Sequence, residues 1–392
     1  MSPLAATGIS APSSACRHAW EQRQLGEVAE IVGGGTPDSS NANYWGGNID
    51  WYTPSEIGAS RTVGTSARKI THEGLDHSSA HLLPAGSILF TSRASIGLMA
   101  FISRPSATNQ GFQSLIPNAS INPDFLYALG PYISRYARRH AAGSTFVEIS
   151  GGALAKTPMR IPSLPEQRRI GEFFSTLDSL IAAAERQEAL LRQKKQAYLQ
   201  LMFPQEGETE PRLRFAGFSG EWQRRKLREL VSEGSIALKR GEVIPRQTGK
   251  YPVYSSSASE DGLFCTSDSF MFDQELVTWS IDGGGKPFYR QHHRFSVTNV
   301  CGYALILNPQ TLTYRFLGLA MGRAWARAHF DYSSKAHPSV IEKIYILSIP
   351  SLPEQRCIGA FFSTLDNLIA AAEKRTKSLH TLKSSYLQRM FV

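Results

Sequence analysis

An internal repeat constrains this chain more than any other feature. Residues 161–203 read IPSLPEQRRIGEFFSTLDSLIAAAERQEALLRQKKQAYLQLMF, and residues 349–391 read IPSLPEQRCIGAFFSTLDNLIAAAEKRTKSLHTLKSSYLQRMF. The offset is 188 residues throughout, and 29 of the 43 aligned positions are identical. Identity at this level does not arise by chance, so the chain contains the same structural element twice.

Each copy of the repeat has the pattern of one long helix. Ser163 with Glu166, and Ser351 with Glu354, match the Ser-x-x-Glu capping box, and both copies have a proline in the first turn. Apolar residues then recur at heptad spacing, which is typical of a coiled-coil seam. Forty helical residues span about 60 Å. The expected seam residues are Ile170, Phe174, Leu177, Ile181, Leu191, Tyr198, Ile358, Phe362, Leu365, Ile369, Leu379 and Tyr386.

Two arrangements of these helices fit the pattern. Near-identical helices favour a mutual, pseudo-twofold pair, because equivalent surfaces can meet each other. In the alternative, each helix packs only on the domain beside it. Glu188, Lys195 and Lys383 take core-type positions in the second half of the helices. The helices are therefore expected either to splay there or to meet another subunit.

Two unlike segments of roughly 140 residues precede the helices. Short strand-like runs, Gly and Pro turns and one helix-like stretch at 123–141 predict α/β domains with a mixed or antiparallel sheet. The predicted division is a disordered N-terminal tail (1–19), a first domain (20–162), a first long helix (163–203), a linker (204–211), a second domain (212–350) and a second long helix (351–392).

The charge balance and the cysteines narrow the class of protein. The formal net charge is +9 at pH 7, which favours polyanionic partners such as nucleic acid. The four cysteines stand singly, without zinc-ligand spacing, and are interpreted as reduced thiols. No run of 18 apolar residues exists, and the first 15 residues do not have the pattern of a secretory signal. A cytoplasmic protein is expected.

The motifs of catalysis are absent from the sequence. Residues 122–125 read NPDF, which departs from the [DN]-P-P-[YF] motif of adenine methyltransferases. The glycines of GGGK (283–286) lack phosphate-loop spacing; they indicate a hairpin turn or, alternatively, a loop that offers Lys286 to a phosphate. His292 and His293 would point to opposite faces of a strand, which argues against a shared metal ion. No catalytic residue and no metal site is predicted.

Several motifs together identify a family resemblance that spans nearly the whole chain. They are IPSLPEQ and FFSTLD, each present twice, GGGTPDSSNANYWGG (33–47), ATNQGFQSLIPN (107–118), RLRFAGFSGEW (212–222), LVTWSIDGGG (276–285) and FSVTNVCG (295–302). The chain resembles the specificity subunits of type I restriction-modification systems. The first half lacks a counterpart to RLRFAGF and begins instead from CRHAWEQRQLGEV.

The resemblance implies a fold and a function. The fold would be two α/β (α+β) target-recognition domains, separated by two long helices that form an antiparallel coiled coil, with a pseudo-twofold internal repeat. Each domain would read one half of a bipartite, asymmetric site in double-stranded DNA, while the helices set the spacing and dock two modification subunits. Those subunits methylate adenine with S-adenosylmethionine, and restriction subunits driven by ATP, with magnesium, can join. The chain itself would be non-catalytic and would hold no cofactor.

The candidate DNA-binding residues are basic and amide side chains in expected loops. Lys and Arg neutralise phosphates, Arg reads guanine, and Asn or Gln reads adenine. The candidates are Arg61, Arg68, Lys69, Arg93, Asn109, Gln110, Lys239, Arg240, Arg246, Lys250, Lys286, Arg290 and Arg294. Each has the alternative of a solvated surface charge, and Asn109 and Asn299 have that of capping a turn.

Three alternatives remain open from the residues. Arg135, Arg138 and Arg139 form either a solvated helix face or a phosphate track. The chain as a whole could be a coiled-coil scaffold that binds protein. It could also be a self-contained DNA methyltransferase or nuclease with unrecognised motifs.

Overall fold

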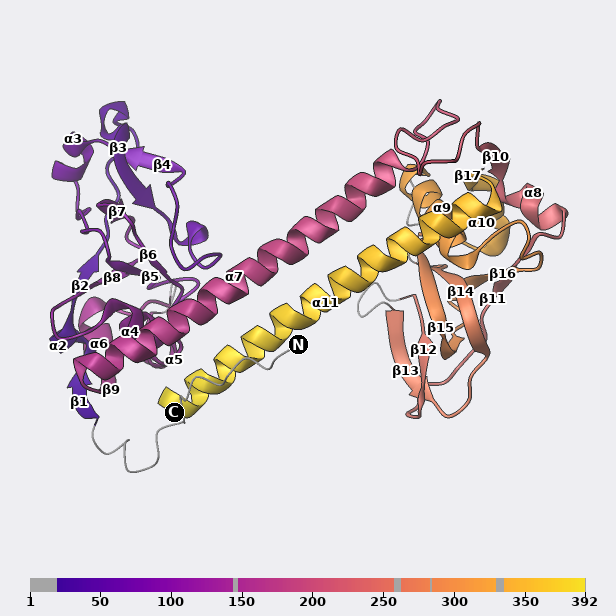
Figure 1. Cartoon of the computed structure of the whole chain (residues 1–392). Coiled ribbons are helices and arrows are strands. Elements are labelled where there is room, and N and C mark those ends of the chain that lie inside the picture. Colours follow the sequence, from indigo (N-terminus) through magenta and orange to yellow (C-terminus); the bar gives the residue numbers. More distant parts are fainter. Residues whose placement is uncertain (1–19, 144–146, 257–261, 283, 329–334, 392) are drawn as a thin grey trace. The chain divides into compact units, whose positions relative to one another are not determined.

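The computed structural model describes residues 20–143, 147–256, 262–282, 284–328 and 335–391. The chain divides into two compact units, whose elements are labelled in Figure 1. Unit 1 comprises Met1–Gln187 and Ala372–Val392, and unit 2 comprises Glu188–Ala371. Each unit thus contains one globular domain with the beginning of one long helix and the end of the other. The N-terminal tail predicted at 1–19 lies outside the described residues.

The two copies of the repeat are single helices, α7 (Leu164–Leu201) and α11 (Leu352–Phe391). In unit 1, the ring of Phe173 on α7 lies 5.0 Å from that of Tyr386 on α11. In unit 2, the rings of Tyr198 and Phe361 lie at the same separation, 5.0 Å. In each unit, therefore, the beginning of one helix contacts the end of the other.

The glutamates of the expected capping boxes fasten the helices to their domains. The Glu354 carboxylate accepts hydrogen bonds from the Arg214 guanidinium at 2.7 and 2.8 Å. Glu166 accepts one from the indole N–H of Trp20 at 3.2 Å. The partners of both glutamates therefore come from the first residues of each domain, not from the first turn of the helix.

Unit 1 contains small sheets and short helices. Strand β1 (Glu21–Gln24) pairs antiparallel with β9 (Pro158–Ile161). A four-stranded sheet has the order β2–β8–β5–β6 (Ala29–Gly33, Gln113–Pro117, Ile88–Phe90, Met99–Phe101), and a three-stranded sheet the order β4–β3–β7 (Arg68–Ile70, Trp45–Tyr52, Ser106–Thr108). The helices are α2 (Leu25–Val28), η1 (Ala42–Tyr44), η2 (Pro54–Glu56), α3 (His72–Asp76), α4 (Pro123–Ala128), α5 (Gly130–His140) and α6 (Gly151–Ala155).

The single helix-like stretch expected at 123–141 is two helices, α4 and α5, which meet at Leu129. Pro131 in the first turn of α5 explains the break, because proline lacks the N–H that a continuous helix would need at that position. The sheets mix parallel and antiparallel pairs, as β3 runs parallel to β7 and antiparallel to β4. The expectation of α/β domains with a mixed sheet holds in this unit.

Unit 2 is built around one larger sheet. Strand β10 (Gln223–Lys226) pairs with β17 (Ile346–Ile349) as β1 pairs with β9 in unit 1. The six-stranded sheet has the order β11–β16–β14–β15–β12–β13 (Ile236–Arg240, Cys301–Ile306, Phe272–Ser280, Pro287–Val297, Tyr251–Tyr254, Leu263–Ser267). Its helices are α8 (Leu227–Ser232), α9 (Tyr314–Arg327) and α10 (Pro338–Ile344).

The turn between β14 and β15 carries the glycines of the GGGK motif. The Gly285 N–H donates to the Ser280 carbonyl at 2.9 Å, and both Gly284 and Gly285 have positive φ angles (69° and 80°). Glycine is favoured there because other residues pay a steric cost in this backbone conformation. Gly283 lies outside the described residues. The hairpin interpretation of this motif agrees with the structure.

The expected seam residues near the start of each helix are core residues of a domain. Ile170 and Phe174 are buried in the core of unit 1, and Ile358 and Phe362 in that of unit 2. The opposite helix ends in the same cores, with Met390 and Phe391 packed in unit 1 and Met202 and Phe203 buried in unit 2. Leu191 and Leu379, in the second halves, are half-buried. The helices therefore pack both on their own domain and on each other.

Candidate nucleic-acid interface

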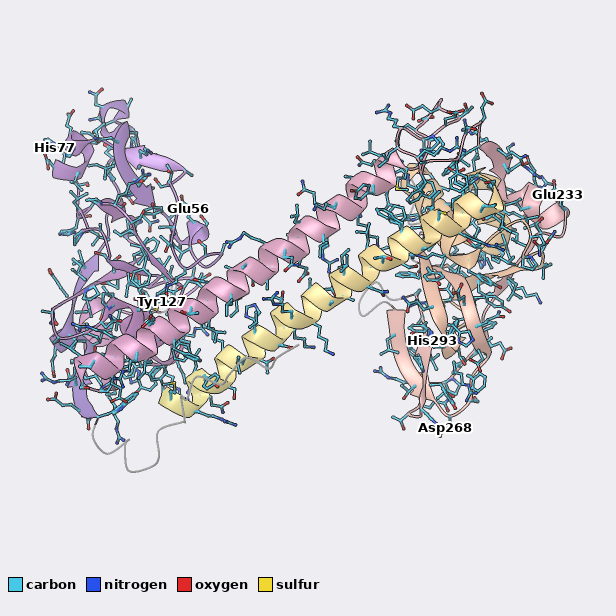
Figure 2. The ribbon with its side chains drawn as sticks, viewed as in Figure 1. Glu56, His77, Tyr127, Glu233, Asp268 and His293 are labelled. Carbon is cyan, nitrogen blue, oxygen red and sulfur yellow. The ribbon has the colours of Figure 1, made fainter. Side chains whose placement is uncertain are left out.

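A cluster of charges joins the domain of unit 1 to both helices. Asp178 on α7 lies 2.6 Å from the Lys383 ammonium on α11 and 2.7 Å from the Arg61 guanidinium. Arg61 also pairs with Asp124, and it stacks over the ring of Tyr127 at 4.5 Å, a residue labelled in Figure 2. The side chain of Arg61 is only 18% exposed. The expectation that Arg61 is an exposed loop residue available to DNA is therefore not supported, because two carboxylates bind it.

Unit 2 contains the same cluster at the matching repeat positions. Asp366 lies 2.5 Å from the Lys195 ammonium and pairs with Arg315, whose guanidinium lies over the ring of Tyr289 at 4.8 Å. The lysines that suggested splaying are thus each paired with an aspartate of the other helix. The third polar position, Glu188, pairs with Arg192 of its own helix at 3.2 Å. The helices do not splay at the two lysines.

Three of the candidates in the first domain meet at one loop. Arg93 donates a hydrogen bond to the backbone carbonyl of Gln110 at 2.9 Å, and the Gln110 side chain accepts one from the Thr36 hydroxyl at 2.5 Å. The side-chain oxygen of Asn109 accepts from the backbone N–H two residues later, at 2.9 Å. Asn109 therefore shapes a turn, which was its alternative role, while Gln110 is exposed.

The glycine-rich segment at 33–35 packs tightly against this loop. A Cβ atom at Gly34 would lie 2.0 Å from the Asn109 carbonyl oxygen, so no larger residue fits there. The Gly35 carbonyl accepts a hydrogen bond from the buried indole of Trp51 at 2.8 Å. The 33–35 segment is therefore held between the loop that carries Asn109 and the domain core.

Arg68 and Lys69 are neighbours on strand β4, but their side chains contact different partners. The Arg68 guanidinium lies 3.6 Å from the ring centre of Trp45, and the residue is exposed. Stacking of this kind holds the guanidinium in place. The Lys69 ammonium instead lies 3.7 Å from a carboxylate oxygen of Asp50. Of the two, Arg68 is the better placed to reach a ligand.

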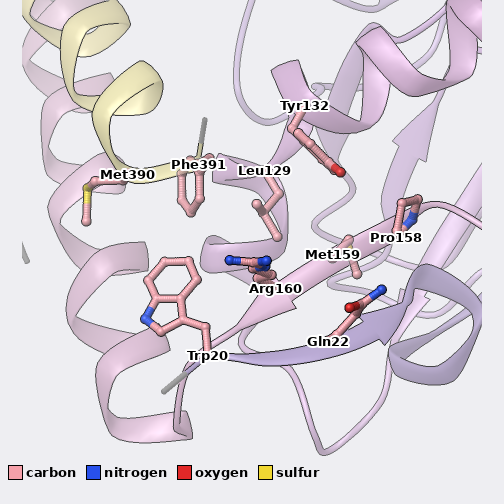
Figure 3. Close-up of a pocket in the computed structure, with 9 residues that line it drawn as sticks. All are labelled: Trp20, Gln22, Leu129, Tyr132, Pro158, Met159, Arg160, Met390 and Phe391. Atoms are coloured by element: carbon pink, nitrogen blue, oxygen red, sulfur yellow. The ribbon is translucent and has the colours of Figure 1, made fainter. Parts of the chain in front are cut away.

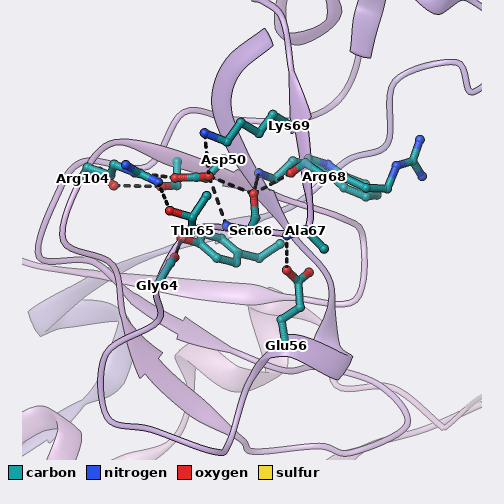
Figure 4. Close-up of polar contacts among 12 residues, drawn as sticks. Asp50, Glu56, Gly64, Thr65, Ser66, Ala67, Arg68, Lys69 and Arg104 are labelled. Carbon is teal, nitrogen blue, oxygen red and sulfur yellow. Dashed lines mark hydrogen bonds and ion pairs between the residues drawn. The ribbon is translucent and has the colours of Figure 1, made fainter. Parts of the chain in front are cut away.

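Asp50 is a buried carboxylate at the centre of a polar network (Figure 4). It pairs with Arg104 and accepts hydrogen bonds from the backbone N–H and the hydroxyl of Ser66 at 3.1 and 3.0 Å. Burial alone would raise the pKa of Asp50, but the hydrogen bonds from Arg104 and Ser66 outweigh it and hold that pKa below its ordinary value. The network keeps Asp50 charged and ties strands β3 and β4 to the 104 segment.

Four exposed candidates in the second domain share one type of contact, a cation over an aromatic ring. The pairs, with the distance from the cation to the ring centre, are Arg246 over Phe264 (5.6 Å), Lys250 over Tyr251 (5.7 Å), Lys286 over Phe288 (5.6 Å) and Arg294 over Phe270 (5.0 Å). Arg294 also pairs with Asp273 at 2.9 Å. These residues combine positive charge with fixed orientation.

The other candidates in this domain are strand residues. Lys239 and Arg240 are exposed at the end of β11, where Arg240 donates to the Asn299 carbonyl. Arg290 on β15 is only 6% exposed; its guanidinium lies 3.8 Å from the ring centre of Tyr254 and donates to the Thr278 hydroxyl at 3.2 Å. The candidates were expected in loops, and the structure corrects that expectation for those that lie on strands β4, β11 and β15: Arg68, Lys69, Lys239, Arg240, Arg290 and Arg294.

The adjacent histidines lie on strand β15, where His293 is labelled in Figure 2. The His293 ring lies 3.1 Å from the Tyr254 hydroxyl, while His292 lies 3.9 Å from Asp273. In the described part of the chain, no group of three or more His, Cys, Asp or Glu side chains could hold a metal ion.

The residues nearest to a methyltransferase motif form a helix cap. The Asn122 side chain accepts a hydrogen bond from the Phe125 N–H at 3.0 Å, and Asp124 pairs with Arg61. These side chains are therefore engaged in holding α4 and the helix junction. Their geometry gives no support to the alternative of a catalytic site here.

An apolar groove of about 430 Å³ lies at the end of α11 in unit 1 (Figure 3). Trp20, Met390 and Phe391 line it, together with Arg160. In unit 2, Phe203, which takes the repeat position of Phe391, is buried, and so is Trp222 near the start of that domain. The two units therefore differ at the place where each receives the end of the other domain's helix.

Comparisons with known proteins agree on one family. A type I restriction enzyme specificity subunit from Methanocaldococcus jannaschii is 35% identical over 176 residues, and one from Escherichia coli is 33% identical over 190 residues. These matches cover 44% and 45% of this chain, and 41% and 46% of the relatives, so the chain is aligned with less than half the length of either.

The fold also has a counterpart among solved structures. The S subunit of a type I restriction-modification system from M. genitalium superposes with a TM-score of 0.70 at 15% identity, over 95% of this chain and 96% of that one. The sequence model of the type I restriction modification DNA specificity domain matches twice, at residues 18–193 and 219–381. With two such matches over most of its length, the chain belongs to the family of type I restriction-modification DNA specificity domains.

Proposed function

We propose that this chain is the non-catalytic DNA-recognition subunit of a type I restriction-modification complex. Each globular domain reads one half of a bipartite, asymmetric site in double-stranded DNA. The observation that carries the proposal is the pair of specificity-domain matches, at 18–193 and 219–381, on domains that differ in sequence but end in near-identical helices. An asymmetric site has two different half-sites, so its reader needs two different domains, while the helices that hold them can be alike.

The two domains are attached to their helices by the same hydrogen bonds. In unit 1, Gln167 accepts from the Asn122 N–H at 2.8 Å and donates to the Pro162 carbonyl at 2.9 Å. At the same repeat position in unit 2, Gln355 accepts from the Thr313 N–H at 3.2 Å and donates to the carbonyl of Pro350 at 3.0 Å. Both glutamines are buried. This repeated attachment supports a common orientation of each domain on its helix.

The helices act as a spacer in this proposal. They form an antiparallel coiled coil, supported by the aromatic contacts and by the Asp–Lys pairs that join α7 to α11 in each unit. Half-sites on one face of a duplex lie about 34–36 Å apart, one helical turn. Helices of 38 and 40 residues are long enough to set that separation.

The first part of each helix docks a modification subunit, so that one chain binds two copies. Of the first 25 repeat positions, 22 are identical, against 7 of the last 18. The identical positions include exposed ones, such as Leu180 and Leu368, which are 44% and 49% exposed. Packing within the chain does not require the same residue at exposed positions of both helices. A partner protein that binds the same surface on both helices would require it.

The chemistry belongs to the partners in this proposal. S-adenosylmethionine would bind to the modification subunits, and ATP and magnesium to restriction subunits. Within the part of the chain that the structure describes, no helix is long and apolar enough to cross a membrane. We place the complex in the cytoplasm, where its DNA substrate is found.

The test is to express the full chain with its modification subunits and to map methylated adenines across the host DNA. The proposal predicts a single split motif with a fixed internal gap. Methylation without sequence preference would contradict it. Methyl transfer by the purified chain alone would favour the enzyme alternative, and binding of protein but not of DNA would favour the scaffold.

A further inference from the structure

Helix α5 in unit 1 presents three arginines on its outer face. Ile133 and Ala137 are buried in the domain core, whereas Arg135, Arg138 and Arg139 are exposed. Residues three and four apart lie side by side on a helix, so the three guanidinium groups emerge from one surface. The Nε of Arg138 donates to the backbone carbonyl of Ile96 at 3.0 Å, which holds one of the three in place.

These arginines line a groove of about 640 Å³. Its other walls include Tyr127 and the Asp178–Lys383 pair. Among the described residues that line the groove, Asp178 is the only carboxylate, and it is already bound by Lys383 and by Arg61. Among the described residues, no carboxylate lies within ion-pair distance of Arg135, Arg138 or Arg139. The groove therefore has three guanidinium groups without counter-charges in the domain itself.

The corresponding region of unit 2 holds its cations through partners within the unit. Lys195 and Arg315, which line a groove of about 660 Å³, both pair with Asp366. On α9, Arg323 and Arg327 donate to the Gln205 side chain and to the Pro204 carbonyl, so the linker binds them. Among the described residues, exposed arginines without a carboxylate partner thus line the α5 groove, whereas the repeated junction has an aspartate in each unit.

We propose that the α5 groove binds consecutive phosphates of the DNA backbone outside direct base reading, an inference that rests on the proposed function. An open groove with several guanidinium groups fits a repeating polyanion, since each phosphate can take one of them. Phosphate contacts add affinity and fix the position of the protein on the duplex, but they carry no sequence information directly. Arg135 and Arg139 make these contacts, and Arg138 supports them.

The test removes two of the charges. The R135A/R139A variant, assembled with its modification subunits, is compared with the parent for binding to duplexes with and without the recognised motif, over a series of salt concentrations. Loss of two phosphate contacts should weaken binding to both duplexes by about tenfold and reduce the slope of log affinity against log salt by about 2. The ratio of the two affinities should stay the same.

Two matched variants complete the experiment. R135K/R139K keeps both charges and should keep most of the salt slope. K374A/K377A removes two exposed lysines from α11 of unit 1, outside the proposed docking region, and should change the slope little, which separates the groove from net charge. An unchanged slope in R135A/R139A would overturn the inference, as would an altered motif preference or a defect in subunit assembly alone. If the parent itself showed no preference for any motif, the proposed function would fail instead.

Discussion

Unit 1 and unit 2 are alike where each domain meets the beginning of its own long helix, and they differ in the larger sheets built beyond that attachment. Both bind a helix through a buried glutamine and an aspartate shared by a lysine and an arginine. Unit 1 then builds four-stranded and three-stranded sheets, with Arg68 stacked on Trp45, whereas unit 2 builds one six-stranded sheet bearing several cation–aromatic pairs. The difference shows that the attachment can be kept while the rest of the domain changes.

The units also differ in how they receive the opposite helix. In unit 2 the chain continues from α7 through the linker, where the Leu213 N–H donates to the Leu201 carbonyl at 2.9 Å, and Phe203 is buried. In unit 1 the matching residue, Phe391, is only half-buried and lines the open groove of Figure 3. Equivalent sequence therefore has unequal burial at the two helix ends.

The largest expected effect comes from the phenylalanines at the helix attachments. Phe174→Ala and Phe362→Ala each remove a fully buried ring at the same repeat position. Each substitution should lower the free energy of unfolding of its own unit by about 3–5 kcal/mol, from lost burial and the cavity left behind. Hydrogen exchange resolved by residue measures this loss in each unit. Values that differ by more than a factor of two would show that the attachments are not equivalent.

A smaller effect is expected from the shared aspartates. Asp178→Asn leaves Lys383 without its counter-charge and Arg61 with Asp124 alone, at a largely buried site, and should cost about 2 kcal/mol. Asp366→Asn should cost less, because the Asp366 side chain is more exposed, 29% against 11%. Denaturant unfolding of both variants checks the order. The reverse order would contradict our account of these clusters.

The smallest expected effect on stability comes from Arg68, and comparison with Arg61 distinguishes an arginine available to a ligand from one that holds the fold. Arg68→Ala should leave unfolding unchanged within about 0.5 kcal/mol and weaken DNA binding by about 1 kcal/mol. Arg61→Ala should instead lower the free energy of unfolding, because it breaks two ion pairs and a stacking contact. Parallel unfolding and binding titrations of the two variants measure both quantities. A stable Arg61→Ala protein with lost sequence preference would restore Arg61 as a DNA-reading residue.

The long helices could be predicted closely from local signals, whereas their polar contacts could not. The prolines and the heptads place both helices to within two residues of α7 and α11. Lys195 and Lys383 looked like weak points because the heptad rule considers one helix at a time. Their partners, Asp366 and Asp178, stand on the other helix. Pairing each repeat with the other in reverse would have brought these charges together.

The candidate DNA-binding residues show a similar limit. Charge and amide content point to Arg68 and Gln110, both of which are exposed. The same rule selects Arg61, whose partners stand 63 and 117 residues away in sequence. No local pattern reveals such partners, so a single sequence does not separate arginines that bind the fold from those that are free to bind a ligand. The DNA-binding role of the candidates as a set stays a prediction.

The central claim is that two near-identical helices hold two different DNA-reading domains at a set distance. The most direct measurement inserts one heptad into each helix, between Gln187 and Glu188 and between Ala371 and Ala372, and maps methylated adenines for the complete complex. Seven residues lengthen a helix by about 10 Å, or three base pairs. The account predicts a gap wider by about three base pairs, with the bases of both half-sites unchanged. Different bases in either half-site, or an unchanged gap, would contradict it.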